Sequence, residues 1–157
     1  MSIRTAFGSL KKFETGGIQI IRDRPERYAF ANVFEVAARS RPWDRVAVAR
    51  NMEYVLEAVR AEGTSPWFAA AHDEVALVMD GAVEVRLRKL DETQRVAPET
   101  QGGLLVEGEP AGPKMGVIRA RRGHLCLLPV GAACQFYAPE TGVILLQTIA
   151  GALTITR

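Results

Sequence analysis

Four residues in this sequence are candidate metal ligands: His72, Glu74, His124 and Cys134. Imidazole and carboxylate ligands suit Fe, Mn, Zn or Ni, and a cysteine can bind Fe or Zn. His72 and Glu74 are two residues apart, so on a continuous strand both side chains would point to the same face. If that face is the interior of a barrel, they can join Cys134 in a three-ligand site, and the chain would be a metalloenzyme by itself.

The same residues also have an interpretation without metal. His72 would be a polar residue near the mouth of the barrel, and Glu74 would form an ion pair with an arginine. Cys134 would fill a vacated ligand position as a small apolar side chain. His124 follows the turn residue Gly123, and it is predicted to be a surface histidine.

The spacing of residues around Glu74 and Cys134 resembles the two motifs of the cupin family. Six residues separate Glu74 from Gly81, and residues 123–131 have the pattern Gly-x5-Pro-x-Gly. The resemblance implies two histidine ligands just before the glutamate and one histidine after the last glycine. Those places hold other residues here: Trp67 or Phe68, Ala69 or Ala70, and Cys134. Motif spacing therefore leaves only Glu74 in a ligand position, and we favour the interpretation without metal.

Two large aromatic residues, Trp67 and Phe68, follow Pro66 in the place of the first ligand histidine. Aromatic side chains are enriched in the cores of protein interfaces, so this pair can present an anchor to another chain. The pair can equally well fill the core or plug a pocket. Cys126 lies among leucines, and it is predicted to be a buried, unreactive thiol.

The elements that must position these residues are mainly β-strands. Val83 and Val85 alternate with charged residues, as expected of a half-buried strand. Asp80–Gly81 lies between strands predicted at 74–79 and 82–88, and this dipeptide is a strong signal for a short hairpin. Further strands are predicted at residues 46–48, 54–61, 115–120, 124–128, 134–137, 143–148 and 153–156. Many short strands separated by Gly and Pro indicate an all-β fold, here a cupin jelly-roll barrel.

The region before the barrel is predicted to be an arm with one short helix. Apolar residues recur at helical spacing between residues 29 and 38, and Pro42 then stops the helix. The predicted apolar face consists of Phe30, Val33, Phe34 and Ala37. Earlier in the arm, the β-branched run at 18–21 can add a strand to a sheet.

Residues 91–114 form the most loop-like segment, rich in Glu, Gly, Pro and Thr. A loop of this length between strands is usually functional or flexible, and we expect only weak pairing at 104–106. These patterns divide the chain into an N-terminal arm and helix at residues 1–42 and a cupin barrel at residues 43–157. The whole is predicted to be a single domain.

Composition excludes two classes of partner. The 157 residues carry a net charge of +2 without a long basic run, so nucleic-acid binding has no electrostatic basis. No apolar stretch reaches the length of a membrane helix. Two cysteines and the lack of a signal-peptide pattern predict free thiols in a reducing cytoplasm.

Beyond the cupin motifs, the sequence resembles the small (alpha) subunit of two-component hydroquinone 1,2-dioxygenases. The resemblance is carried by residues 12–18, 22–25, 51–68, 71–74, 78–81 and 142–148. It implies a heterotetramer of small and large cupin-like subunits, with ferrous iron held by the large subunit. It further implies bacterial breakdown of phenols, in which hydroquinone is cleaved to 4-hydroxymuconic semialdehyde and the small subunit is metal-free.

We therefore expect an accessory subunit without catalytic residues or a cofactor of its own. Its partners would be a larger catalytic subunit that carries Fe(II) and a phenolic substrate in the complex. Two alternatives stay open. The chain can be a stand-alone cupin that binds a small ligand in a pocket lined by Trp67, Phe68 and His72, or a lone metalloenzyme that uses His72, Glu74 and Cys134.

Overall fold

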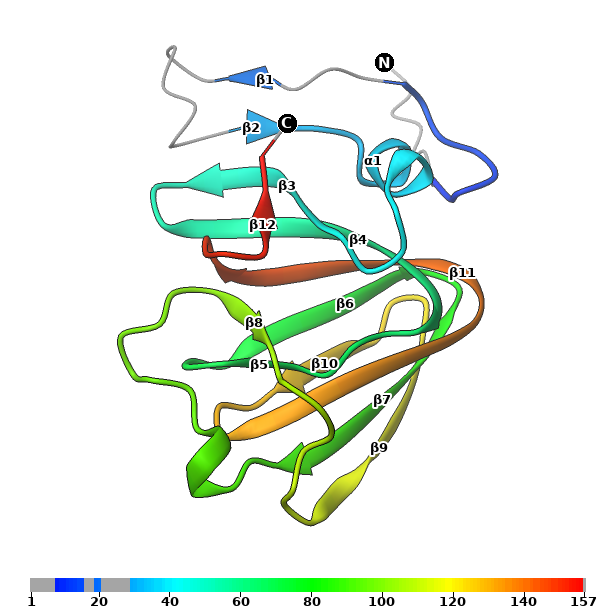
Figure 1. Cartoon of the computed structure of the whole chain (residues 1–157). Helices are drawn as coiled ribbons and strands as arrows, with labels where there is room; N and C mark the ends of the chain where they lie inside the picture. Colours follow the sequence, from blue (N-terminus) through cyan, green and yellow to red (C-terminus); the bar gives the residue numbers. More distant parts are fainter. Residues whose placement is uncertain (1–7, 16–18, 21–28, 157) are drawn as a thin grey trace.

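In the computed structural model of the chain, residues 8–15, 19–20 and 29–156 are described. Strands dominate, and most of them belong to one ten-stranded sheet that curls back on itself (Figure 1). The strands are β1 (Gln19–Ile20), β2 (Ala29–Phe30), β3 (Arg45–Asn51), β4 (Tyr54–Thr64), β5 (Phe68–Ala70), β6 (Glu74–Asp80), β7 (Ala82–Lys89), β8 (Gly103–Leu105), β9 (Lys114–Arg121), β10 (Leu125–Leu128), β11 (Ala132–Ile149) and β12 (Thr154–Ile155). The helices are α1 (Val33–Arg39) and the short 3-10 helix η2 (Glu92–Gln94). The all-β prediction is confirmed.

The long strand β11 joins the two layers of the barrel. It runs for 18 residues, and its register shifts between Ala138 and Gly142. Its second half lies between β4 and β6 in the layer ordered β10-β6-β11-β4-β3-β12. Its first half pairs with β7 and β5, and these strands continue to β9 and β8 in the other layer. The two separate strands predicted at 134–137 and 143–148 are therefore one bent strand.

The predicted hairpin at Asp80–Gly81 is wrong. Strand β6 pairs with the second half of β11, where Asp80 lies opposite Val143, and β7 pairs with the first half, where Glu84 lies opposite Tyr137. The two strands therefore follow β11 in the same direction and form one bent ribbon instead of a reversal. Gly81 provides the bend with a φ of 76°, a conformation that glycine adopts without strain.

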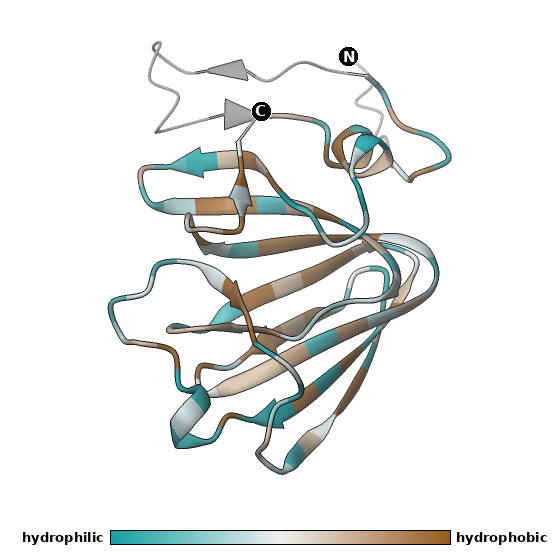
Figure 2. Ribbon diagram, in the orientation of Figure 1, coloured by the Kyte–Doolittle hydropathy of each residue, from teal (hydrophilic) through white to brown (hydrophobic). Residues whose placement is uncertain are grey.

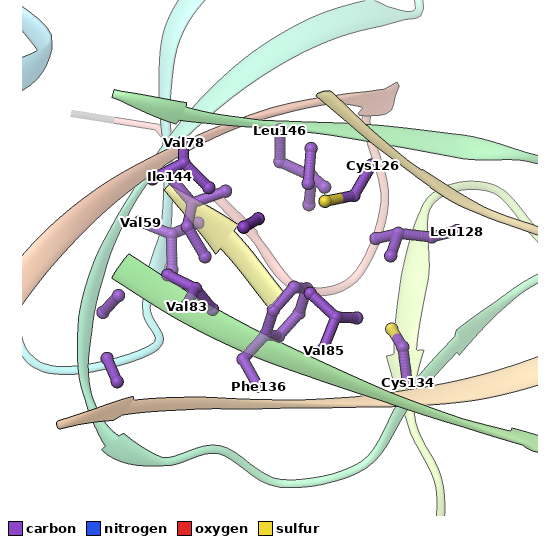
Figure 3. Packing of buried hydrophobic residues seen from close by; sticks show 14 of the residues in the cluster. Val59, Val78, Val83, Val85, Cys126, Leu128, Cys134, Phe136, Ile144 and Leu146 are labelled. Carbon is purple, nitrogen blue, oxygen red and sulfur yellow. The ribbon is translucent and has the colours of Figure 1, made fainter. Parts of the chain in front are cut away.

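The interior of the barrel is filled by side chains from both layers. Figure 3 shows labelled residues from the two layers pointing toward one another, among them Val85, Cys126, Phe136 and Ile144. Figure 2 shows the expected alternation of apolar and polar segments along the strands. Both cysteines are free and buried, as predicted for Cys126.

Helix α1 begins later than its apolar pattern predicts. The Asn32 side chain accepts hydrogen bonds from the backbone amides of Phe34 and Glu35, and this N-cap sets the start of the helix at Val33. Phe30 belongs instead to β2, which pairs with β1, so its place on the helix face was predicted wrongly. The helix ends at Arg39, before Pro42 as expected.

The helix covers one end of the outer surface of the barrel. Phe34 and Ala37 pack on Val143 of β11, and Leu10 and Phe13 from the arm join this small cluster. The predicted strand at 18–21 is present as β1 at residues 19–20, and its other residues lie outside the described part of the chain.

The segment at 91–114 is packed onto the barrel. Strand β8 pairs with β5, so the predicted weak pairing is present at Leu104 and Leu105. The Gln94 side chain accepts a hydrogen bond from the Ala111 amide and donates one to the Glu109 carbonyl. These two hydrogen bonds hold the beginning of the segment, at Gln94, against its end, at residues 109–111. Within the described residues, no helix is long and apolar enough to cross a lipid bilayer.

Candidate functional site

The polar centre of the barrel is built on the first residue of β6. Glu74 is 2% exposed, and its Oε2 accepts a hydrogen bond from Nη1 of Arg45 at 3.1 Å. Arg45 is the first residue of β3 and is itself 3% exposed. The expected ion pair between Glu74 and an arginine is thus confirmed, and sequence patterns had not indicated which arginine.

A second buried carboxylate lies near the same guanidinium nitrogen. Oε2 of Glu57, on β4, is 3.8 Å from Nη1 of Arg45, and the Thr154 hydroxyl donates a 2.6 Å hydrogen bond to Oε1 of Glu57. Burial raises the pKa of Glu57, and the nearby charge of Glu74 raises it further. Arg45 and the Thr154 hydrogen bond act in the opposite direction, but burial dominates.

Aromatic side chains hold the guanidinium from the remaining side. The Arg45 guanidinium carbon lies 4.5 Å from the centre of the Phe68 ring, a cation–π distance. Phe68 contacts Phe136, which in turn stacks on Trp43 at 5.8 Å between ring centres. Phe68 is therefore a core residue, whereas the neighbouring Trp67 points to another small cluster that contains Leu90 and Ala133.

The proposed metal ligands do not come together as a ligand set. His72 precedes β6, so the same-face argument fails, and its Nδ1 lies 3.0 Å from the Asp73 carbonyl oxygen. Burial raises the pKa of Cys134 to about 12, which keeps the thiol protonated, although metals bind the thiolate. His124 is exposed on the surface, as expected.

Within the described ranges, no group of three or more His, Cys, Asp or Glu side chains is arranged to hold a metal ion. Of the possible ligands, Glu74 is already bound to a guanidinium. The chemistry of this donor set does not fit the metal that the cupin fold usually carries.

An open cavity of about 560 Å³ lies at the mouth of the barrel above Arg45. Its walls are mostly apolar and include Trp43, Phe68, Leu105 and Leu153. Of the three residues proposed to line a ligand pocket, only Phe68 contributes to this cavity. Trp67 and His72 lie elsewhere.

The outer surface of one layer is unusually apolar. Leu125 and Leu127 on β10 are 69% and 54% exposed, and they lie opposite Leu77 and Val75 of β6. Leu77 in turn lies opposite Leu145 of β11. The neighbouring row runs from Val75 through the exposed Gln147 of β11 to Leu56 of β4. We call the six residues Leu56, Val75, Leu77, Leu125, Leu127 and Leu145 the outer apolar face. The outward side of a two-layer β-fold is usually polar, so this face is an exception.

Comparison with solved structures identifies close relatives over the whole chain. A chain of hydroquinone 1,2-dioxygenase from Sphingomonas sp. TTNP3, a structure with 4-hydroxybenzoate bound, shares 51% identity with a TM-score of 0.86. The match covers 99% of this chain and 95% of that one. The chain belongs to the family of hydroquinone 1,2-dioxygenase cupin subunits. Scans against protein-family models and against curated proteins give no match.

A second hydroquinone 1,2-dioxygenase, PnpCD in complex with Cd²⁺ and 4-hydroxybenzonitrile, shares 47% identity with a TM-score of 0.84. That match covers 99% of this chain and 94% of the other. PnpCD in complex with Fe³⁺ also contains a longer chain, of which this fold covers 37%, at 14% identity and a TM-score of 0.61. A cupin-2 domain protein from Shewanella frigidimarina shares the fold at 20% identity and a TM-score of 0.51, covering 71% of this chain and 84% of that one.

Proposed function

We propose that this member of the hydroquinone 1,2-dioxygenase family is a non-catalytic accessory subunit. The observation that carries the proposal is the Arg45–Glu74 pair, because it occupies the one side chain that motif spacing leaves in a cupin ligand position. The iron, as Fe(II), and the phenolic substrate would then be bound by a larger cupin-like subunit. This chain would hold that subunit in its active shape during cleavage of hydroquinone to 4-hydroxymuconic semialdehyde.

Two chain sizes in the related enzyme support a larger partner. PnpCD structures match this fold once over 94% of a chain and once over only 37% of a longer chain. An enzyme of this family therefore combines a chain of the present size with one more than twice as long.

The outer apolar face supports an obligate association. Leu125 and Leu127 would cost free energy in water, about 0.025 kcal/mol for each Å² of exposed apolar surface. Obligate interfaces are large and apolar, so covering this face with the larger chain is the simplest way to recover that energy. We therefore assign the outer apolar face as the contact surface for the larger subunit.

The test is co-expression with the longer cupin chain of a hydroquinone 1,2-dioxygenase of this family. We expect the two chains to co-purify, iron to follow the larger chain, and oxygen uptake with hydroquinone to require both. This chain loaded alone with Fe(II) under anaerobic conditions should retain no iron. About one ion per chain, lost on Glu74→Ala, would instead establish a lone metalloenzyme that binds iron through its own side chains.

The contact surface has its own matched test. Leu127→Asp places a charge in the outer apolar face, and Val117→Asp places one on β9 at nearly the same exposure, 55% against 54%. We expect Leu127→Asp to weaken co-purification at least tenfold and Val117→Asp to leave it unchanged. Equal effects of the two variants would exclude this face as the specific contact.

The cavity at the barrel mouth favours one second candidate, a stand-alone cupin that binds a small ligand. Its mostly apolar walls would suit a small aromatic molecule. Isothermal titration of the isolated chain with 4-hydroxybenzoate would test this. Binding that Phe68→Leu abolishes would favour the ligand-binding function, whereas no heat change would exclude it for this ligand.

A further inference from the structure

Two carboxylates from different strands meet one guanidinium inside the apolar barrel. Glu57 and Glu74 are 1% and 2% exposed, and their Oε2 atoms lie 3.8 and 3.1 Å from the same Nη1 of Arg45. Buried carboxylates are so costly that they must be paired, protonated or bound to a metal ion. Oxygen ligands of this kind suit hard divalent cations such as Mn²⁺. In this barrel the guanidinium supplies the positive charge that the two carboxylates require.

The surroundings of Arg45 are shaped to hold its side chain. The Phe68 ring covers one side of the guanidinium. Residue 103 is a glycine, and a Cβ there would collide with Nη1 and the guanidinium carbon of Arg45. A cation of this particular shape is therefore accommodated by an aromatic ring and by a position without a side chain.

The guanidinium does not satisfy every hydrogen bond in the cluster. Oε2 of Glu57 and Nη2 of Arg45 are buried and have no hydrogen-bond partner in the described part of the chain. One positive charge also faces two carboxylates, so the cluster retains unused capacity for a cation. Oε2 of Glu57 has only its 3.8 Å ion pair with Arg45, and a divalent ion would bind such a carboxylate oxygen more closely.

We propose that Arg45 is a built-in replacement for a metal ion, and that its removal converts Glu57 and Glu74 into a divalent-cation site. The barrel is then metal-free because its cation is covalently part of the chain, and not only because histidine ligands are missing. This inference goes beyond the accessory role, since it concerns the isolated chain and does not depend on any partner.

The test compares Mn²⁺ binding by the unaltered chain and three variants. Arg45→Ala removes the cation, Arg45→Lys keeps a positive charge as the matched control, and Arg45→Ala/Glu74→Gln removes one carboxylate as well. Each protein is titrated with Mn²⁺ near neutral pH, and free Mn²⁺ is followed by its electron paramagnetic resonance signal. The shift of Tm with Mn²⁺ is recorded in parallel, because an ion that binds only the folded state stabilises it.

We expect Arg45→Ala alone to bind one Mn²⁺ per chain and to gain thermal stability from it. The unaltered chain, Arg45→Lys and the double variant should bind none. If Arg45→Ala is unfolded without metal, Mn²⁺ should restore its circular-dichroism spectrum, and should not restore that of the double variant.

Two results would overturn the inference. The first is an Arg45→Ala variant that neither binds Mn²⁺ nor refolds in its presence, because the carboxylates would then take up protons instead. The second is Mn²⁺ binding by the unaltered chain that is lost on Glu74→Gln, because the guanidinium would then not exclude the ion. Either result would leave the accessory-subunit proposal standing, since that proposal is tested by co-purification and oxygen uptake.

Discussion

Replacing Glu74 by glutamine tests the central ion pair with little change of shape. Gln fills nearly the same volume, so the main change is the loss of one buried negative charge opposite Arg45. Breaking a buried pair by removing one partner costs about 3–5 kcal/mol, because the other charge stays buried without compensation. Arg45 keeps Glu57 at 3.8 Å as a second partner. We therefore expect the lower end, about 3 kcal/mol, for Glu74→Gln.

An exposed ion pair of shorter length provides the control. Nε of Arg60 lies 2.7 Å from Oε2 of Glu62, but the Glu62 side chain is 46% exposed. Water already solvates this pair, so Glu62→Gln should cost less than about 1 kcal/mol. The prediction is thus that burial, and not the distance between charges, decides which pair matters for stability.

Urea unfolding followed by circular dichroism measures both costs. The shift of the midpoint at constant slope gives the change in the free energy of unfolding. An effect of Glu74→Gln equal to or smaller than that of Glu62→Gln would refute the reasoning. Glu74→Gln should still support oxygen uptake in the complex with the larger chain, at temperatures where the variant is folded. Loss of activity by a folded variant would contradict the accessory role.

Three further predictions follow from the same cluster. The pKa of Glu57 is raised from 4.5, so the stability that its protonated form contributes is present below pH 4.5 and is lost as the pH rises through the raised pKa. The destabilisation caused by Glu57→Gln, measured by urea unfolding, should therefore fall over that pH range. Burial raises the pKa of Cys134 from 9.0 to about 12. The stability contributed by its protonated thiol is therefore complete below pH 9 and is lost as the pH rises from 9 to about 12. In this pH range the unfolding free energy of the unaltered chain should fall by about 1.4 kcal/mol per pH unit because of this thiol, and Cys134→Ala should remove that part of the fall. The same dependence of unfolding free energy on pH in both proteins would contradict the burial of the thiol. Gly103→Ala should push Arg45 aside and cost about 1–3 kcal/mol, and a neutral effect on the urea midpoint would show that the guanidinium is free to move.

Local patterns in the sequence were enough for the strands and for the absent ligands. The alternation at Val83 and Val85 predicted β7 because a half-buried strand must turn every second side chain inward. The substitutions at 67–70 and at Cys134 already indicated a barrel without its histidine ligands. The family resemblance was also present in the sequence, and the 51% identical relative confirms it.

Local signals failed where a distant strand decides the outcome. Asp80–Gly81 is a dipeptide typical of hairpin turns. Because β11 pairs with both β6 and β7, the chain bends at Gly81 and does not reverse its direction. The helix likewise begins at its Asn32 cap and not with its first apolar residue, because β1 pairs with the segment containing Phe30.

The sequence by itself determined that this chain is an all-β cupin of the hydroquinone 1,2-dioxygenase family, with Glu74 as the one residue left in a cupin ligand position. Only the tertiary structure decided what that glutamate does. Arg45 is 29 residues away along the chain, and it reaches Glu74 because β3 and β6 both contribute to the wall of the same barrel. No periodicity encodes such a pairing. It arises because a buried charge must find its counter-charge wherever the fold brings one within reach.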